Sequence, residues 1–232
     1  MKTLTILIIS CSILYAIPAK SQDIKADTIQ HSANSLQHFK EDLKAGVQDF
    51  DSAKTMNDLV AATNHLGLIA KKYDDQWTAN YYASYSLIIL SFIEKDKKKK
   101  DAYLDDAEVF LNKTISNYKS ENDELYVLNA LFDNARLAVQ PAARYKKYGN
   151  LFNENIDKAK SIQPNNPRIY YLKGNSTYYT PKMFGGGAKS ALVYFEKADM
   201  LFQNENTKDI YKPSWGKLQN TQMLDKCKAE IK

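Results

Sequence analysis

Apolar residues recur at intervals of three and four along most of the chain, and this spacing constrains the fold more than any other feature. Leu36, Phe39, Leu43, Val47 and Phe50, for example, are separated by 3, 4, 4 and 3 positions. Residues at this spacing share one face of an α-helix. No segment shows the apolar–polar alternation of a half-buried strand. The sequence therefore predicts an all-α protein.

The same spacing predicts a series of helices with glycine or proline near their boundaries. Asn166 and Pro167 suit a helix start, with Asn as the cap and Pro at the first helical position. A short last helix is expected at the C-terminus. The other expected helices are 30–50, 59–73, 77–92, 104–118, 125–139, 148–159, a segment starting at Pro167, and 188–202.

Every second expected helix repeats one pattern of residues at positions 0, +4 and +7. The four sets are Ala62, Leu66 and Ile69; Ala107, Leu111 and Thr114; Phe152, Ile156 and Ala159; and Ala191, Phe195 and Ala198. Their first members are 45, 45 and 39 residues apart. Small residues at such positions let two helices pack closely, and a fixed period indicates a repeat architecture.

The last unit resembles the tetratricopeptide repeat. Ala191, Phe195 and Ala198 match its second-helix signature, and the stretch 173–178 is similar to the close-contact part of its first helix. The resemblance covers residues 55–205, with a period longer than the usual repeat of about 34 residues. It implies a right-handed α-α solenoid of about four helical hairpins plus a C-terminal capping helix.

An insertion in the last unit, at residues 180–187, is similar to one in exported tetratricopeptide-like proteins, including the tetratricopeptide partners of periplasmic TRAP transporters. The resemblance implies a non-catalytic scaffold that binds a partner protein, a peptide or a small solute in a groove. An accessory role in a periplasmic transporter, a structural assembly subunit that can form homo-oligomers, and an unrecognised envelope enzyme remain alternatives. A membrane role is expected only through a transporter partner, and no cofactor is expected.

The first 21 residues have the features of a signal peptide. Lys2 is followed by an apolar run from Leu4 to Tyr15, and small residues precede a cut between Ser21 and Gln22. The run is too short to span a bilayer. Residues 22–232 are then one periplasmic or secreted repeat domain. A lipoprotein anchored through Cys11 is the less favoured alternative.

Charge argues against a nucleic-acid partner. Cleavage after Ser21 leaves 30 basic and 27 acidic residues, and the two signs are interleaved. No continuous basic face of the kind that binds phosphate backbones is present in the sequence. The run of four lysines at 97–100 is interpreted as a solvated loop after a helix C-terminus, where cations suit the helix dipole.

Arginines and tyrosines supply the candidate ligand contacts. Only 3 of the 32 basic residues are arginine. The planar guanidinium of arginine can donate two parallel hydrogen bonds, so we interpret each arginine as either a ligand contact or a brace between helices. Tyrosines on the first helix of each hairpin can line a groove or fill space between helices. The candidate ligand-binding residues are Arg136, Arg168, Asn175, Tyr178, Tyr81 and Tyr85.

A turn with three glycines precedes the helix at 188–202. We interpret it as architecture, formed by Pro181, Phe184, Gly185, Gly186 and Gly187, with Met183 and Phe184 filling the hairpin. An anion site is the alternative, because free backbone N–H groups at a helix start bind phosphate. Neither nucleotide-binding motif accompanies the turn.

Catalytic and metal sites are not predicted. The three histidines include a pair seven positions apart, and two metal ligands on one helix face are expected at i and i+4. No serine, histidine or cysteine arrangement indicates nucleophilic catalysis.

Overall fold

The computed structural model describes residues 20–118, 122–205, 209 and 211–231, and within the first helix it describes side chains from Asn34 onward. Of the signal peptide predicted at residues 1–21, residues 1–19, including Cys11, lie outside the described residues. The chain divides into two compact units, residues 1–39 and 40–232.

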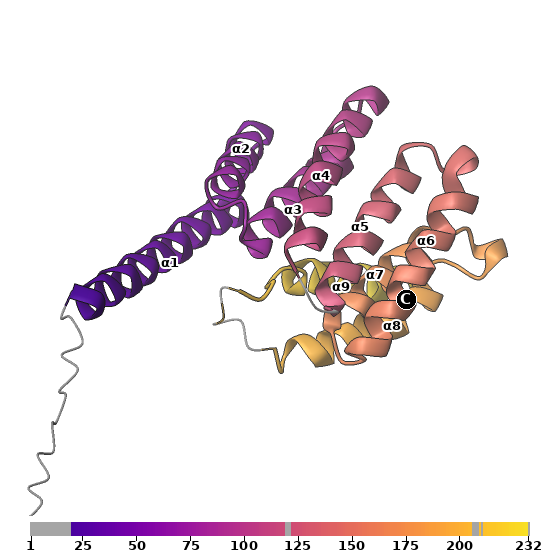
Figure 1. Ribbon diagram of the computed structural model, residues 1–232. Helices are drawn as coiled ribbons and strands as arrows, with labels where there is room; N and C mark the ends of the chain where they lie inside the picture. Colours follow the sequence, from indigo (N-terminus) through magenta and orange to yellow (C-terminus); the bar gives the residue numbers. More distant parts are fainter. Residues whose placement is uncertain (1–19, 119–121, 206–208, 210, 232) are drawn as a thin grey trace, which may run out of the picture. The chain divides into compact units, whose positions relative to one another are not determined.

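The described residues form nine α-helices and a short 3-10 helix, with no strand, so the prediction of an all-α, solenoid-like fold is confirmed (Figure 1). The helices are α1 (Lys20–Ser52), α2 (Met56–Lys72), α3 (Trp77–Ile93), α4 (Lys97–Asn117), α5 (Asp123–Val139), α6 (Pro141–Ile162), α7 (Pro167–Tyr179), α8 (Ala188–Phe202) and α9 (Lys217–Ile231), and the 3-10 helix is η1 (Lys182–Phe184).

Consecutive helices of the larger unit pair as hairpins. The most extensive contacts are between α3 and α4, α5 and α6, and α7 and α8, while α3 also contacts α5, and α5 contacts α7. The last helix, α9, packs on α8. Each hairpin therefore buries its apolar face against a neighbour, as expected of a repeat array closed by a terminal helix.

The 0, +4, +7 pattern marks the buried face of every second helix. All twelve of its residues, on α2, α4, α6 and α8, are buried in the core. The pattern could be found in the sequence because a helix packs against its partner with the same face along its whole length.

Two glycines allow the closest helix contacts. A Cβ atom added to Gly174 of α7 would lie 2.6 Å from a ring carbon of Phe195 on α8. Gly46 of α1 faces α2 in the same way, where a Cβ atom would lie 2.7 Å from Ile69 and 2.9 Å from Leu66. Both glycines are in helix interiors, so their use here is close packing and not backbone freedom.

Helix starts follow the expected capping chemistry. At α7, the Asn166 side chain accepts a hydrogen bond from the backbone N–H of Arg168, and Pro167 occupies the first turn, as predicted. At α2, Thr55 and Asp58 form a reciprocal capping box. Such caps satisfy backbone donors that have no partner inside the helix.

Three boundaries differ clearly from the expectation. The first helix, expected at 30–50, begins at Lys20. The lysines at 97–100 begin α4 behind the N-cap Asp96, so their assignment to a loop was wrong. The helix expected around apolar positions 148–159 stops before Pro164 as predicted but begins earlier, because Pro141 stands at the first position of α6, where proline loses no helical hydrogen bond.

Candidate functional site

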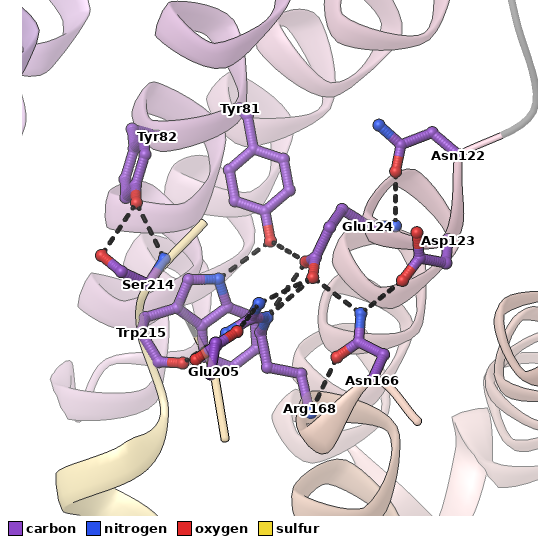
Figure 2. A network of polar contacts seen from close by, with 10 residues as sticks. All are labelled: Tyr81, Tyr82, Asn122, Asp123, Glu124, Asn166, Arg168, Glu205, Ser214 and Trp215. Atoms are coloured by element: carbon purple, nitrogen blue, oxygen red, sulfur yellow. Dashed lines mark hydrogen bonds and ion pairs between the residues drawn. The ribbon is translucent and has the colours of Figure 1, made fainter. Parts of the chain in front are cut away.

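A buried ion pair between Arg168 of α7 and Glu124 of α5 is the centre of the polar network in Figure 2. The Arg168 Nε atom donates to both Glu124 carboxylate oxygens, at 2.9 and 3.1 Å. Nη1 donates to the Trp215 carbonyl at 3.1 Å, and Nη2 donates to Glu205 at 2.5 Å. Every guanidinium nitrogen therefore has an acceptor within the protein.

Aromatic side chains extend this network from α3 to the segment before α9 (Figure 2). The Tyr81 hydroxyl donates to Glu124 at 3.2 Å and accepts from the Trp215 indole N–H at 2.8 Å. The Tyr82 hydroxyl accepts from the backbone N–H of Ser214 at 3.1 Å. The network therefore joins five parts of the chain: α3, α5, α7, the segment at Glu205 and the segment before α9.

The pKa values of the network reflect both its burial and its charges. Burial raises the pKa of Glu124, and the positive charge of Arg168 opposes that rise. Burial alone would lower the pKa of Arg168, but Glu124 outweighs it and the pKa is raised. Burial also raises the pKa of Tyr81 well above its ordinary value, so its hydroxyl stays a donor. These groups hold α3, α5 and α7 together through contacts inside the protein.

Arg136 lies in a second, separate cluster that joins α4, α5 and α6. Its Nη2 donates to Asp105 at 2.6 Å and to Glu108 at 3.2 Å, and its Nη1 donates to Asp101 at 3.2 Å. Arg144 binds Asp101 through both terminal nitrogens, at 2.7 and 2.8 Å. All three arginines of the chain therefore contact carboxylates of the protein.

The tyrosines predicted to contact a ligand occupy two environments. Tyr81 and Tyr85 of α3 are buried, and the Tyr85 ring stacks on Trp215 with centroids 4.9 Å apart. Asn175 and Tyr178 are half-buried on α7, where the Tyr178 hydroxyl donates to Glu230 of α9.

The structure brings only part of the predicted set together. Arg168 and Tyr81 meet through Glu124, whereas Arg136 lies elsewhere. Ligand binding by these residues stays a prediction, and every contact described for them is internal. The sequence analysis missed Glu124, because an acidic residue in the first turn of a helix looks like an ordinary dipole partner.

The three-glycine turn is held by backbone hydrogen bonds. Gly187 N–H donates to the Thr177 carbonyl at 3.0 Å, and Gly186 N–H donates to the Pro181 carbonyl at 3.3 Å. Gly185 and Gly187 have φ of 83° and 95°, in the left-handed region that favours glycine. A Cβ atom at Gly186 would lie 2.0 Å from the Thr180 carbonyl oxygen. Each glycine is thus required by the turn.

The turn leaves its apolar side chains in solvent. Met183 is 82% exposed and Phe184 is 72% exposed, and the neighbouring Tyr179 is 71% exposed. The expectation that Met183 and Phe184 fill the hairpin was therefore wrong. The backbone hydrogen bonds close the turn by themselves, so no apolar plug is needed.

A pocket of about 320 Å³ lies between the end of α1 and the first half of α2. It is lined by Asp49, Ser52, Ala53, Asp58, Ala61, Ala62 and His65. The four α2 residues are spaced at i, i+3, i+4 and i+7, so they share one face of that helix. His65 Nδ1 lies 2.9 Å from Asp49 Oδ2. The sequence analysis missed this pair, because its partners are 16 residues apart on different helices.

Among the described residues, no group of three or more histidine, cysteine, aspartate or glutamate side chains is placed to hold a metal ion. The same part of the chain has no helix with the length and hydropathy that crossing a membrane requires.

The fold and these sites define an all-α, solenoid-like protein whose buried polar groups brace its helices. No protein-family model matches the chain, and no curated protein matches it. Among solved structures, the chain is similar to the HusA haemophore from Porphyromonas gingivalis, with 30% sequence identity and a TM-score of 0.69. The match covers 85% of this chain and 94% of the haemophore chain. The chain therefore belongs to the same family as this haemophore.

Proposed function

We propose that the protein is a non-catalytic binding protein that captures haem or a related planar tetrapyrrole outside the cytoplasm. The observation that carries this proposal is the similarity to the HusA haemophore, which extends over nearly the full length of both chains. Export is supported by the leader-like residues 1–21. Under this proposal, the small solute expected from the sequence is haem or a related tetrapyrrole.

The chemistry of haem sets what the protein must offer. Haem has two flat apolar faces, a carboxylate-bearing edge and an iron with open axial positions. Binding sites for such ligands are mostly apolar, with a few placed polar groups. The α1–α2 pocket is lined by three alanines, Ser52, His65 and the two carboxylates Asp49 and Asp58. Apart from His65, the residues that line this pocket include no aromatic or basic side chain to match the flat faces or the carboxylate-bearing edge of haem, so the proposal rests on the structural similarity and not on this pocket.

Titration of residues 22–232 with haemin tests the proposal. We expect a saturable change in the haem absorption band at one ligand per chain, with a Kd of about 1 μM or tighter, equivalent to about −8 kcal/mol. The chain unfolded in guanidinium chloride is the control for non-specific association. If neither haemin nor metal-free protoporphyrin IX binds saturably to the folded chain, the proposal is wrong.

A structural assembly role is the second candidate, and the exposed tip of the α7–α8 turn favours it. Tyr179, Met183 and Phe184 place three large apolar side chains in solvent within six residues. Apolar groups gathered on a surface indicate an interaction site. In this alternative the partner is a second copy of the chain, consistent with the tetratricopeptide-like resemblance.

Sedimentation velocity over a range of protein concentrations tests the assembly role. A dimer that is lost in the double variant Met183→Ser/Phe184→Ser would support it. A monomer at all concentrations would count against it.

A further inference from the structure

The turn between α7 and α8 holds large apolar side chains in solvent. Met183 and Phe184 are 82% and 72% exposed, and Tyr179 at the end of α7 is 71% exposed. The Phe184 N–H donates to the Pro181 carbonyl at 2.9 Å, which closes the short helix η1 that carries Met183 and Phe184. Figure 1 shows this turn as an orange loop that projects from the α7–α8 hairpin. The backbone therefore presents an apolar tip, which consists of Tyr179, Met183 and Phe184.

Exposed lysines flank the apolar tip. Lys182 lies in the turn itself, and Lys189 lies in the first turn of α8. Lys226 of α9 is also exposed, and its Nζ atom lies 4.8 Å from the centre of the Tyr178 ring. Glu230 adds a carboxylate on α9, and that carboxylate accepts a hydrogen bond from the Tyr178 hydroxyl. The side chains closest to the tip along the chain are therefore basic.

The sequence around the tip has one sign of charge. The stretch 158–195 contains no aspartate and no glutamate, although the whole chain has 27 acidic residues against 32 basic ones. The basic residues of this stretch are Lys158, Lys160, Arg168, Lys173, Lys182 and Lys189. A negatively charged surface is therefore the electrostatic complement of this part of the molecule.

A second copy of the chain fits this tip less well. In a symmetric dimer a surface patch meets its own copy, which would bring Lys182 and Lys189 of both chains together. Large aromatic side chains each bury about 150–250 Å², so three side chains of this size supply less than the area of about 800 Å² that each partner gives to a stable interface. The tip is both too small and too basic for self-association.

The surface of a lipid bilayer matches both features of the tip. Aromatic side chains are enriched where membrane proteins cross the head-group level, because their rings suit the apolar side and their polar ends the wet side. Anionic head groups attract lysines that lie near the surface. A lysine side chain can also keep its amine among the head groups while its aliphatic stem follows neighbouring apolar groups.

We propose that the apolar tip inserts into the surface of an anionic lipid bilayer, with Lys182 and Lys189 in contact with the head groups. The contact is peripheral and reversible, since a few side chains bury far less apolar surface than a membrane-spanning helix does. This inference goes beyond the proposed function and does not depend on haem binding.

Co-sedimentation with vesicles tests the proposal. Residues 22–232, without haemin, are mixed with vesicles of equimolar phosphatidylcholine and phosphatidylglycerol or of phosphatidylcholine alone. We expect tighter binding to the anionic vesicles, and Met183→Ser/Phe184→Ser should weaken that binding about tenfold or more. The matched control is Leu68→Ser/Leu218→Ser, since these two leucines are 63% and 66% exposed outside the tip. The control should bind as the wild type does.

Two further variants separate charge from insertion. Lys182→Gln/Lys189→Gln should weaken binding to the anionic vesicles about tenfold, and added salt should weaken the binding of the wild type in the same way. In Phe184→Trp, the emission of the new indole should shift to shorter wavelength on addition of anionic vesicles, and brominated lipid should quench it. Circular dichroism checks that the helices of each variant are intact.

The outcomes distinguish a lipid surface from other partners of the tip. If the wild type does not bind anionic vesicles, or if Met183→Ser/Phe184→Ser binds them equally well, the proposal is wrong. A dimer that forms without lipid and is lost in the same variant would assign the tip to a second copy of the chain. Haemin binding is measured separately, so its failure would overturn the proposed function and leave this inference standing.

Discussion

At the scale of single residues, the burial of Asp133 makes the stability of the folded protein depend on pH. Its side chain on α5 is 6% exposed, and one carboxylate oxygen accepts from Asn155 at 2.8 Å. Burial raises the pKa of Asp133 to about 7, although the hydrogen bond opposes that rise. The folded protein therefore holds this proton more tightly than the unfolded chain, where the pKa is about 3.9.

Asp133→Asn should change the pH dependence of stability. With a raised folded-state pKa, the contribution of Asp133 is fully present below about pH 4 and is lost as the pH rises through 7. The stability of the neutral variant relative to the wild type should therefore rise by about 2–3 kcal/mol between pH 5 and pH 8.5. Urea unfolding at both pH values measures this gain. A constant difference between the two proteins would contradict the explanation.

Arg168 is the single residue on which most of the buried polar network depends. Arg168→Met should lower the free energy of unfolding by about 3–5 kcal/mol, because it leaves Glu124 buried without a counter-ion. Arg144→Met is the matched control, since Arg144 and its partner Asp101 are 25% and 29% exposed. We expect a loss of about 1 kcal/mol or less there. Chemical denaturation measures both losses. Equal losses would show that the buried ion pair stabilises the fold no more than the more exposed one.

At the scale of elements, the α7–α8 hairpin depends on the absence of a side chain at Gly174. Gly174→Ala should destabilise the protein by about 1–3 kcal/mol, because the added methyl meets the buried Phe195 ring. Gly149→Ala in α6 is the control, since its Cβ would make an ordinary contact at 3.7 Å with Leu137. That change should be neutral or stabilise by up to about 1 kcal/mol. Thermal melts show whether each variant is less or more stable than the wild type.

At the scale of the whole molecule, α9 closes the array by covering α8. Leu224 and Cys227 of α9 pack with Ala191 and Phe195 in one core cluster. The Asn220 amide also donates to the Phe195 carbonyl at 3.0 Å. A repeat array needs such a terminal element, because its last repeat has no neighbour on one side.

Leu224→Ala should therefore cost about 2–4 kcal/mol of unfolding free energy, as removal of a buried leucine side chain does. Leu218→Ala in the same helix is the control, because Leu218 is 66% exposed and should change stability by less than about 0.5 kcal/mol. If Leu224→Ala were as mild as the control, the capping role of α9 would be wrong.

The sequence by itself determined the helices and the face that each one buries. The twelve residues of the 0, +4, +7 pattern and the start of α7 at Asn166 and Pro167 were predicted correctly. These features are local, since helix periodicity and capping are set by residues within a few positions of one another.

Only the tertiary structure decided which polar groups meet. Arg168 and Glu124 are 44 residues apart, and Tyr81 and Trp215 are 134 apart. His65 pairs with Asp49 across a helix–helix contact, and Phe184 stays in solvent because backbone hydrogen bonds already close its turn. The spacing of residues along the sequence does not indicate such long-range pairings. They follow from how helices are placed against each other, which depends on the packing of the whole array.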